Sequence, residues 1–225
     1  MENIQNELFI RVLKRLESSE ALNEIVLVGS WCLPIYKYLY GDIPSIPVLR
    51  TTDIDLLISN PKHIRHPVNI DIILQEIGFD PSFDMYSPLI KYKHNHLDVE
   101  FLSQRVRGEE KILKIPELKI TAQVLSYMEL ASKYAMKIDY MGIQLRVPEI
   151  PAYVLHKAIV QTRRINEAKQ IKDAATVVGL GELIAERQDM KERLSQIFEE
   201  LPRSWQKIIL GMVKVHSQEL FGILR

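Results

Sequence analysis

The chain has very little cysteine, no excess of charge of either sign and no long apolar run. Its 225 residues include one cysteine, Cys32, so no disulfide can form within the chain, and a reducing compartment is favoured. Lysine plus arginine number 29, as do aspartate plus glutamate, so no whole-molecule field draws the protein to nucleic acid or membrane. The longest apolar stretch, residues 25–36, is too short and too interrupted to span a bilayer, and the first residues lack the apolar core of a signal peptide. We expect a cytoplasmic protein with no membrane partner.

The remaining composition is that of an ordinary folded chain. Hydrophobic residues make up 47% and charged residues 26%, and no internal repeat or low-complexity linker interrupts them. Apolar periodicity and turn residues predict helices, strands and hairpins in this order: a helix over 4–19, strand 25–28, helix 32–40, strand 54–58, helix 68–77, hairpin 89–92 with 97–102, hairpin 136–140 with 143–147, then helices from Ile150. This order predicts an α/β (α+β) domain over 1–148 and a helical domain over 149–225.

Two aspartates, Asp53 and Asp55, lie at the start of an otherwise apolar strand. Aspartate is depleted in strands, and residues two apart point to the same face, about 7 Å from each other. That spacing allows two carboxylates to hold a pair of divalent ions about 4 Å apart. A solvated strand start or a turn explains most isolated Asp-x-Asp pairs, so this pair needs further support.

A second acidic pair, Asp98 and Glu100, alternates with Leu97, Val99 and Phe101. The plain interpretation is a half-exposed antiparallel strand with a solvated face. If this strand neighbours the one that carries Asp53, three or four carboxylates converge and repel one another unless cations neutralise them. A third carboxylate could also accept the proton of an attacking hydroxyl.

Gly29 and Ser30 end the strand over 25–28 and precede the helix over 32–40. A strand that ends in glycine and enters a helix brings backbone N–H groups to one point, which favours an anion site. There Gly29 would let a phosphate approach the backbone, and the Ser30 hydroxyl could donate to it. Ser30 as a plain helix N-cap is the alternative.

These motifs occur in an order that resembles the nucleotidyltransferase superfamily, which has a polymerase-β-like fold. The motifs are Ile25-Val26-Leu27-Val28-Gly29-Ser30, then Thr52-Asp53-Ile54-Asp55-Leu56-Leu57, then Leu97-Asp98-Val99-Glu100-Phe101. The resemblance implies a mixed sheet flanked by helices, with a helical C-terminal part. One departure is the connection of 22 residues between Ser30 and Asp53, which is longer than is common in the family.

The same resemblance implies the site. Asp53, Asp55 and Glu100 would be catalytic metal ligands, with Asp98 as the other candidate for the third carboxylate. They would hold Mg²⁺, two ions in all, which bind the triphosphate of an NTP such as ATP. Gly29 and Ser30 would bind nucleotide phosphate.

A run in the helical part resembles C-terminal motifs of AbiEii-type toxins and of uncharacterised bacterial nucleotidyltransferases. It comprises Lys157, an arginine in the pair Arg163-Arg164, and a Lys169-x-x-x-Asp173 spacing. By that resemblance Lys157 binds triphosphate, and Asp173 orients a basic neighbour or a substrate. The plain alternative is a solvated helix face with a weak Lys169–Asp173 surface ion pair.

The function we expect is transfer of a nucleoside monophosphate from an NTP to a hydroxyl acceptor, with release of pyrophosphate. The acceptor stays open between a small-molecule alcohol, an RNA end and a protein hydroxyl. A local basic patch could serve RNA ends, and its members would be Lys157, Arg163, Arg164, Lys169 and Lys172. Two other classes remain: a nucleotide-binding or regulatory module without chemistry, and a helical interaction protein whose acids are incidental. Four histidines in expected turns lack metal-ligand spacing and are interpreted as loop residues: His63, His66, His94 and His96.

Overall fold

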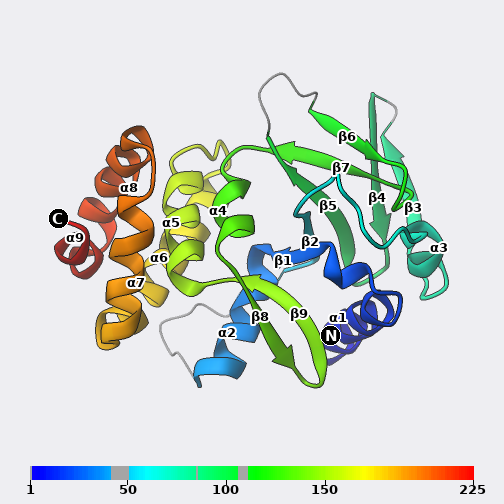
Figure 1. Cartoon of the computed structure of the whole chain (residues 1–225), viewed down its shortest axis with the longest axis horizontal. Coiled ribbons are helices and arrows are strands. Elements are labelled where there is room, and N and C mark those ends of the chain that lie inside the picture. The colour runs from blue at the N-terminus through cyan, green and yellow to red at the C-terminus, as the bar shows by residue number, and fades with distance from the viewer. Residues whose placement is uncertain (1, 42–50, 85, 106–110) are drawn as a thin grey trace. The chain divides into compact units, whose positions relative to one another are not determined.

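The computed structural model describes residues 2–41, 51–84, 86–105 and 111–225, and its elements are labelled in Figure 1. The chain forms two compact units, one of Met1–Cys32 with Arg50–Pro148 and one of Leu33–Leu49 with Glu149–Arg225. The first unit contains α1 (Glu2–Ser18), η1 (Ala21–Asn23), β1 (Ile25–Val28), η2 (Gly29–Trp31), β2 (Asp53–Ile58), α3 (Ile70–Gln75), β3 (Asp80–Asp84), β4 (Ser87–Lys93), β5 (Asp98–Gln104), β6 (Ile112–Ile115), β7 (Ile120–Leu125), α4 (Met128–Lys133), β8 (Ala135–Tyr140) and β9 (Ile143–Pro148). The second contains α2 (Cys32–Tyr40) beyond its first residue, α5 (Ile150–Gln161), α6 (Glu167–Glu186), α7 (Gln188–Glu199), α8 (Arg203–His216) and α9 (Gln218–Leu224).

A mixed sheet forms the centre of the first unit, and β8 with β9 forms a separate two-stranded sheet beside it (Figure 1). Its strands run in the order β1-β2-β5-β4-β3, with β7 also paired to β5 and β6 paired to β7. β2 and β5 are parallel, whereas β1–β2 and β4–β5 are antiparallel. The structure therefore confirms the predicted fold class, a mixed sheet with helices and a helical C-terminal part.

Two strands, β4 and β7, pair with different parts of the same edge of strand β5. Its first residues pair with β4, and its last residues pair in parallel with β7. The backbone N–H of Ile90 on β4 donates to Thr121 Oγ1 on β7 at 2.7 Å, so a side chain links the two strands where they meet. The predicted hairpin of 89–92 with 97–102 is thereby confirmed as β4–β5, and that of 136–140 with 143–147 as β8–β9.

One face of the sheet is apolar at one end and acidic at the other. Leu57 and Leu102 pack with Met128 and Ala131 of α4, together with the β1 valines, in a buried cluster. Side chains alternate along a strand, so the face that carries Leu57 also carries Asp55 and Asp53. Helix α4 thus covers the apolar end of this face, and the acidic end is the part that could receive a ligand.

Three strands and one α-helix of the first unit are absent from the sequence-based prediction: β3, β6, β7 and α4. β6 lies inside a segment that reads as a charged loop, and β3 begins Asp80-Pro81, which is a poor strand start. Strand β3 is the last strand of the sheet order, where proline is tolerated because an edge N–H needs no partner. These elements form because the sheet supplies partners, which local patterns do not reveal.

In the second unit, α5 is buried on nearly all sides, from Ile150 to Ile159. Pro151 lies in its first turn, where a missing N–H costs no helical hydrogen bond. Tyr153 packs edge-on against Tyr36 of α2 with ring centroids 5.4 Å apart. Pro202 precedes helix α8, and α9 follows as the last described helix. None of the described helices combines the length and hydropathy needed to cross a bilayer.

Candidate functional site

Four carboxylates lie in register on neighbouring strands of the first unit. The parallel pairing of β2 and β5 places Asp53 opposite Asp98 and Asp55 opposite Glu100. In both strands these positions are half-buried while the residues between them are fully buried. Paired positions in a parallel ladder face the same side of the sheet, so the four side chains share one face.

The shared face carries an excess of negative charge. Burial raises the pKa of Asp98, the charges of Asp53 and Glu100 raise it further, and Lys93 and Lys91 only partly oppose this. The raised pKa of Asp98 therefore has two causes, burial first and then like charge on the same face. A cation placed on this face would relieve that repulsion.

Two cations of β4, Lys91 and Lys93, already lie there, and neither was predicted from the sequence. Lys91 of β4 donates from Nζ to Glu100 Oε1 at 2.6 Å. Partial burial would lower the pKa of Lys91, but the hydrogen bond to Glu100 and the charges of Glu100, Asp53 and Asp98 raise it overall. The predicted hairpin contained the signal for this residue, since its strands bring Lys91 beside the acidic strand.

The carboxylates are not gathered around one point. Within residues 2–41, 51–84, 86–105 and 111–225, no group of three or more His, Cys, Asp or Glu side chains is placed so that it could hold a metal ion. Glu100 is turned toward Lys91, and Asp55 lies against Gly29. The acids thus share a face, while their side chains have separate partners.

Gly29 is positioned by two constraints that only glycine satisfies. Its φ is +71°, and a Cβ built on it would lie 1.9 Å from Asp55 Oδ2. The strand register explains this contact, because Val28 pairs with Asp55. The glycine turn and one carboxylate are therefore in direct contact, as a site built from both motifs requires.

The interpretation of Ser30 as the helix N-cap is wrong. Ser30 lies inside the 3-10 turn η2, whose N-cap is Val28 with extended backbone, and α2 begins only at Cys32. The positive φ of Gly29 starts the tight turn directly, so the capping position falls earlier in the chain. Trp31 is a core residue, 4% exposed and stacked on Phe9 with ring centroids 4.0 Å apart.

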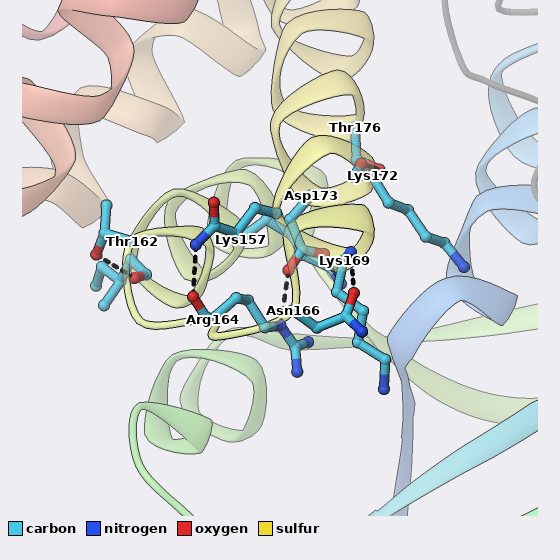
Figure 2. Close-up of polar contacts among 10 residues, drawn as sticks. Lys157, Thr162, Arg164, Asn166, Lys169, Lys172, Asp173 and Thr176 are labelled. Carbon is cyan, nitrogen blue, oxygen red and sulfur yellow. Dashed lines mark hydrogen bonds and ion pairs between the residues drawn. The ribbon is translucent and has the colours of Figure 1, made fainter.

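In the second unit a buried ion-pair network joins α5 to α6 (Figure 2). Lys157 Nζ donates to Asp173 Oδ1 at 2.7 Å, and Arg164 Nε donates to Asp173 Oδ2 at 3.1 Å. Lys157 and Asp173 are 7% and 3% exposed. Asp173 thereby fixes two cationic neighbours with its two carboxylate oxygens.

This network overturns two expectations. Asp173 pairs with Lys157 and Arg164 rather than in a surface ion pair with Lys169, whose backbone N–H is bound by the N-cap Asn166 at 3.0 Å. Lys157 is also buried, so it cannot belong to an exposed basic patch for RNA ends. The helical spacing was correct, but it cannot show which face of α6 packs on α5.

His156, next to Lys157, is a further buried polar residue in α5. It is 7% exposed, and its Nε2 has no hydrogen-bond partner among the described residues. Burial, followed by the charge of Lys157, lowers its pKa to about 3. Its imidazole is therefore neutral at ordinary pH.

The fold and the site define an α/β protein of the nucleotidyltransferase class, with paired carboxylates beside a glycine turn. A family model described as Nucleotidyltransferase matches residues 7–201, and the chain belongs to that family. No curated protein matches the sequence. Among solved structures, the chain is similar to an antigenic nucleotidyltransferase-like protein from Paracoccidioides brasiliensis, with 17% identity over 90% of this chain and 93% of that one and a TM-score of 0.44.

Proposed function

We propose that the protein is a Mg²⁺-dependent nucleotidyltransferase that moves a nucleoside monophosphate from an NTP, such as ATP, to a hydroxyl acceptor and releases pyrophosphate. The observation that carries the proposal is the register of β2 and β5, which aligns Asp53 with Asp98 and Asp55 with Glu100. Membership of a nucleotidyltransferase family supports the same reaction class.

The donor set suits magnesium, which prefers carboxylate oxygens and keeps water and phosphate in its remaining positions. The raised pKa of Asp98, caused by burial and then by Asp53 and Glu100, supports a cation on this face. Asp53, Asp55 and Glu100 would hold the two ions, with Asp98 as the other candidate for the third position. Bound there, the metal would neutralise phosphate charge as it builds up on the leaving pyrophosphate.

The protein's own side chains and backbone would bind the nucleotide and orient the acceptor hydroxyl. Gly29 and Ser30 lie in the η2 turn in contact with Asp55, and there Ser30 would offer its hydroxyl as a donor to nucleotide phosphate. In the second unit Asp173 holds Lys157 and Arg164 in a fixed arrangement between α5 and α6. Glu100 would accept the acceptor's hydroxyl proton as that oxygen bonds to the α-phosphorus and the bond to pyrophosphate breaks. Most of the rate gain in such chemistry comes from positioning and charge neutralisation.

The cellular setting proposed for this reaction is the cytoplasm. The one cysteine, Cys32, is buried, and its thiol donates to the backbone oxygen of Leu27 at 3.4 Å. A buried thiol with such a packing role suits a reducing compartment.

The test is pyrophosphate release from each NTP, with radiolabelled nucleotide offered to small alcohols, RNA ends and proteins. We expect Asp53→Asn and Asp55→Asn each to abolish turnover while the protein stays folded. Asp80→Asn, an exposed carboxylate on the edge strand β3, is the matched control and should keep full activity. Turnover at the parental rate in both site variants would refute the proposal.

A second candidate is a nucleotide-binding or regulatory module that performs no transfer. The Lys91–Glu100 ion pair favours it, because it occupies a carboxylate that catalysis would need. Calorimetry with NTP and Mg²⁺, followed by the pyrophosphate assay, separates the two. Binding without release identifies the module, and binding with release identifies the enzyme.

A further inference from the structure

A polar pocket of about 650 Å³ lies in the first unit, at the opposite end of β1 and β2 from the carboxylates. Ile25 pairs with Ile58 at this end, whereas Val28 pairs with Asp55 at the other. Ser59, which lines the pocket, follows Asp55 by four residues, or about 13 Å along an extended strand. The pocket is therefore separate from the proposed catalytic face.

Two cations of the β8–β9 hairpin line this pocket directly opposite each other. Lys137 pairs with Arg146 across the strands, and both residues contribute to the lining. Like charges at opposed positions destabilise a strand pair. This hairpin is nevertheless formed, so an anion between the two side chains would remove a cost that the fold otherwise carries.

Arg146 makes few hydrogen bonds for a half-buried arginine. Its side chain is half-buried, and Ser59 Oγ, at 2.6 Å, is its hydrogen-bond partner among the described residues. A guanidinium has five N–H donors and matches the geometry of phosphate oxygens. Burial lowers the pKa of Arg146, and the charge of Glu24 opposes that shift, so the group keeps its proton but lacks a close counter-ion within the described chain.

The one carboxylate of the lining, Glu24, is occupied in building the pocket wall. Glu24 is 7% exposed, and its Oε1 accepts the backbone N–H groups of Arg65 at 2.9 Å and His66 at 3.2 Å. This holds the loop after β2 so that Arg65 joins Lys137 and Arg146 in the lining. With histidines neutral, three positive charges face one negative charge, in a chain whose formal net charge is zero.

We propose that this pocket is a second anion site, which binds an oligophosphate such as pyrophosphate without a nucleobase. Its volume lies within the range of small-molecule sites. Leu22 and Leu145 are its apolar lining residues, and the described lining has no Phe, Tyr or Trp, the larger rings on which a base stacks. Three cations around a small polar volume match the charge and the oxygen-rich surface of a diphosphate.

The experiment is calorimetric titration of the whole chain with inorganic pyrophosphate in EDTA, with AMP as a second probe. We expect one saturable site for pyrophosphate and much weaker binding of AMP. Arg146→Met removes the charged hydrogen bonds that the guanidinium would donate to the ligand, so it should weaken pyrophosphate binding by about 10- to 100-fold. Arg65→Gln and Lys137→Gln change exposed side chains, so they leave folding intact and should each weaken binding several-fold.

Two controls separate this site from general charge and from the proposed active site. Lys114→Met removes an exposed cation of β6 outside the pocket and should leave binding unchanged. Asp53→Asn with Asp55→Asn should also bind pyrophosphate normally in EDTA, whatever becomes of the proposed catalysis. The proposal is overturned if the parent shows no saturable binding, if Arg65→Gln and Lys137→Gln bind like the parent, or if Lys114→Met weakens binding as much as they do.

Discussion

Removal of Asp173 should destabilise the helical unit more than removal of either cation that it binds. The side chains of Lys157 and Asp173 are 8% and 4% exposed, so the ammonium has almost no access to water once its partner is lost. Breaking a buried pair from one side costs about 3–5 kcal/mol. Arg164 is 37% exposed and can regain water, so it adds little to that cost.

The three single variants should therefore rank in a defined order. Asp173→Ala loses about 3–5 kcal/mol, which for a chain of this size lowers the melting temperature by about 6–20 °C. Lys157→Met costs less because Arg164 still neutralises Asp173 through the 3.1 Å bond. Arg164→Ala costs least, about 0–1 kcal/mol, as an exposed ion pair does.

The assay is urea and thermal unfolding followed by far-ultraviolet circular dichroism, which reports the helices. The double variant Lys157→Met with Asp173→Leu removes both charges and should be more stable than Asp173→Ala alone. A loss below about 1 kcal/mol for Asp173→Ala, or a double variant less stable than it, would refute the argument that desolvation sets the cost.

Three further predictions concern single positions. His156 binds its proton far more weakly when folded, with a pKa of about 3 against about 6.5 unfolded, so stability should be unaffected above pH 6.5 and fall as pH drops below it. The loss should be about 1.4 kcal/mol at pH 5.5, and it should disappear in His156→Gln but not in the exposed control His63→Gln, as measured by urea unfolding across pH. Gly29→Ala should lose more stability than Gly142→Ala: both have positive φ, but only Gly29 has Asp55 where the Cβ would lie, so equal losses would show that the contact does not matter. Lys91→Met should raise the pKa of Asp98 still further, since Lys91 now lowers it, and an NMR titration that finds the pKa unchanged would contradict this.

The sequence predicts well the elements whose signal is local. β1 is a continuous apolar run, and β2 and β5 begin with acidic residues that alternate with apolar ones. These patterns predict that each segment is a strand and which side chains share a face. The register between β2 and β5 was not readable, because parallel strands are joined by a long crossover that leaves their alignment to tertiary packing. That register places the two acidic motifs side by side and so defines one candidate site.

Side-chain partners were the least predictable part. Spacing along α6 suggested Lys169 for Asp173, but the packing of α5 on α6 presents Lys157 from 16 residues earlier. Lys91 shows the same limit, because its role depends on where β4 ends against β5. A pattern indicates which residues share a helix or strand face, and only the packed fold decides what lies opposite that face.

The position of β5 at the junction of three strands has a consequence for synthesis of the chain. β2 is complete at Ile58, and β5 begins at Asp98, about 40 residues later. At about 5–20 residues per second, a ribosome leaves β2 for about 2–8 s without the neighbour that covers its second edge. During that interval a strand with four large aliphatic residues has an open edge, where another chain could pair. We expect nascent chains released before β5 to aggregate, and those released after Lys133, when β7 and α4 are complete, to aggregate less.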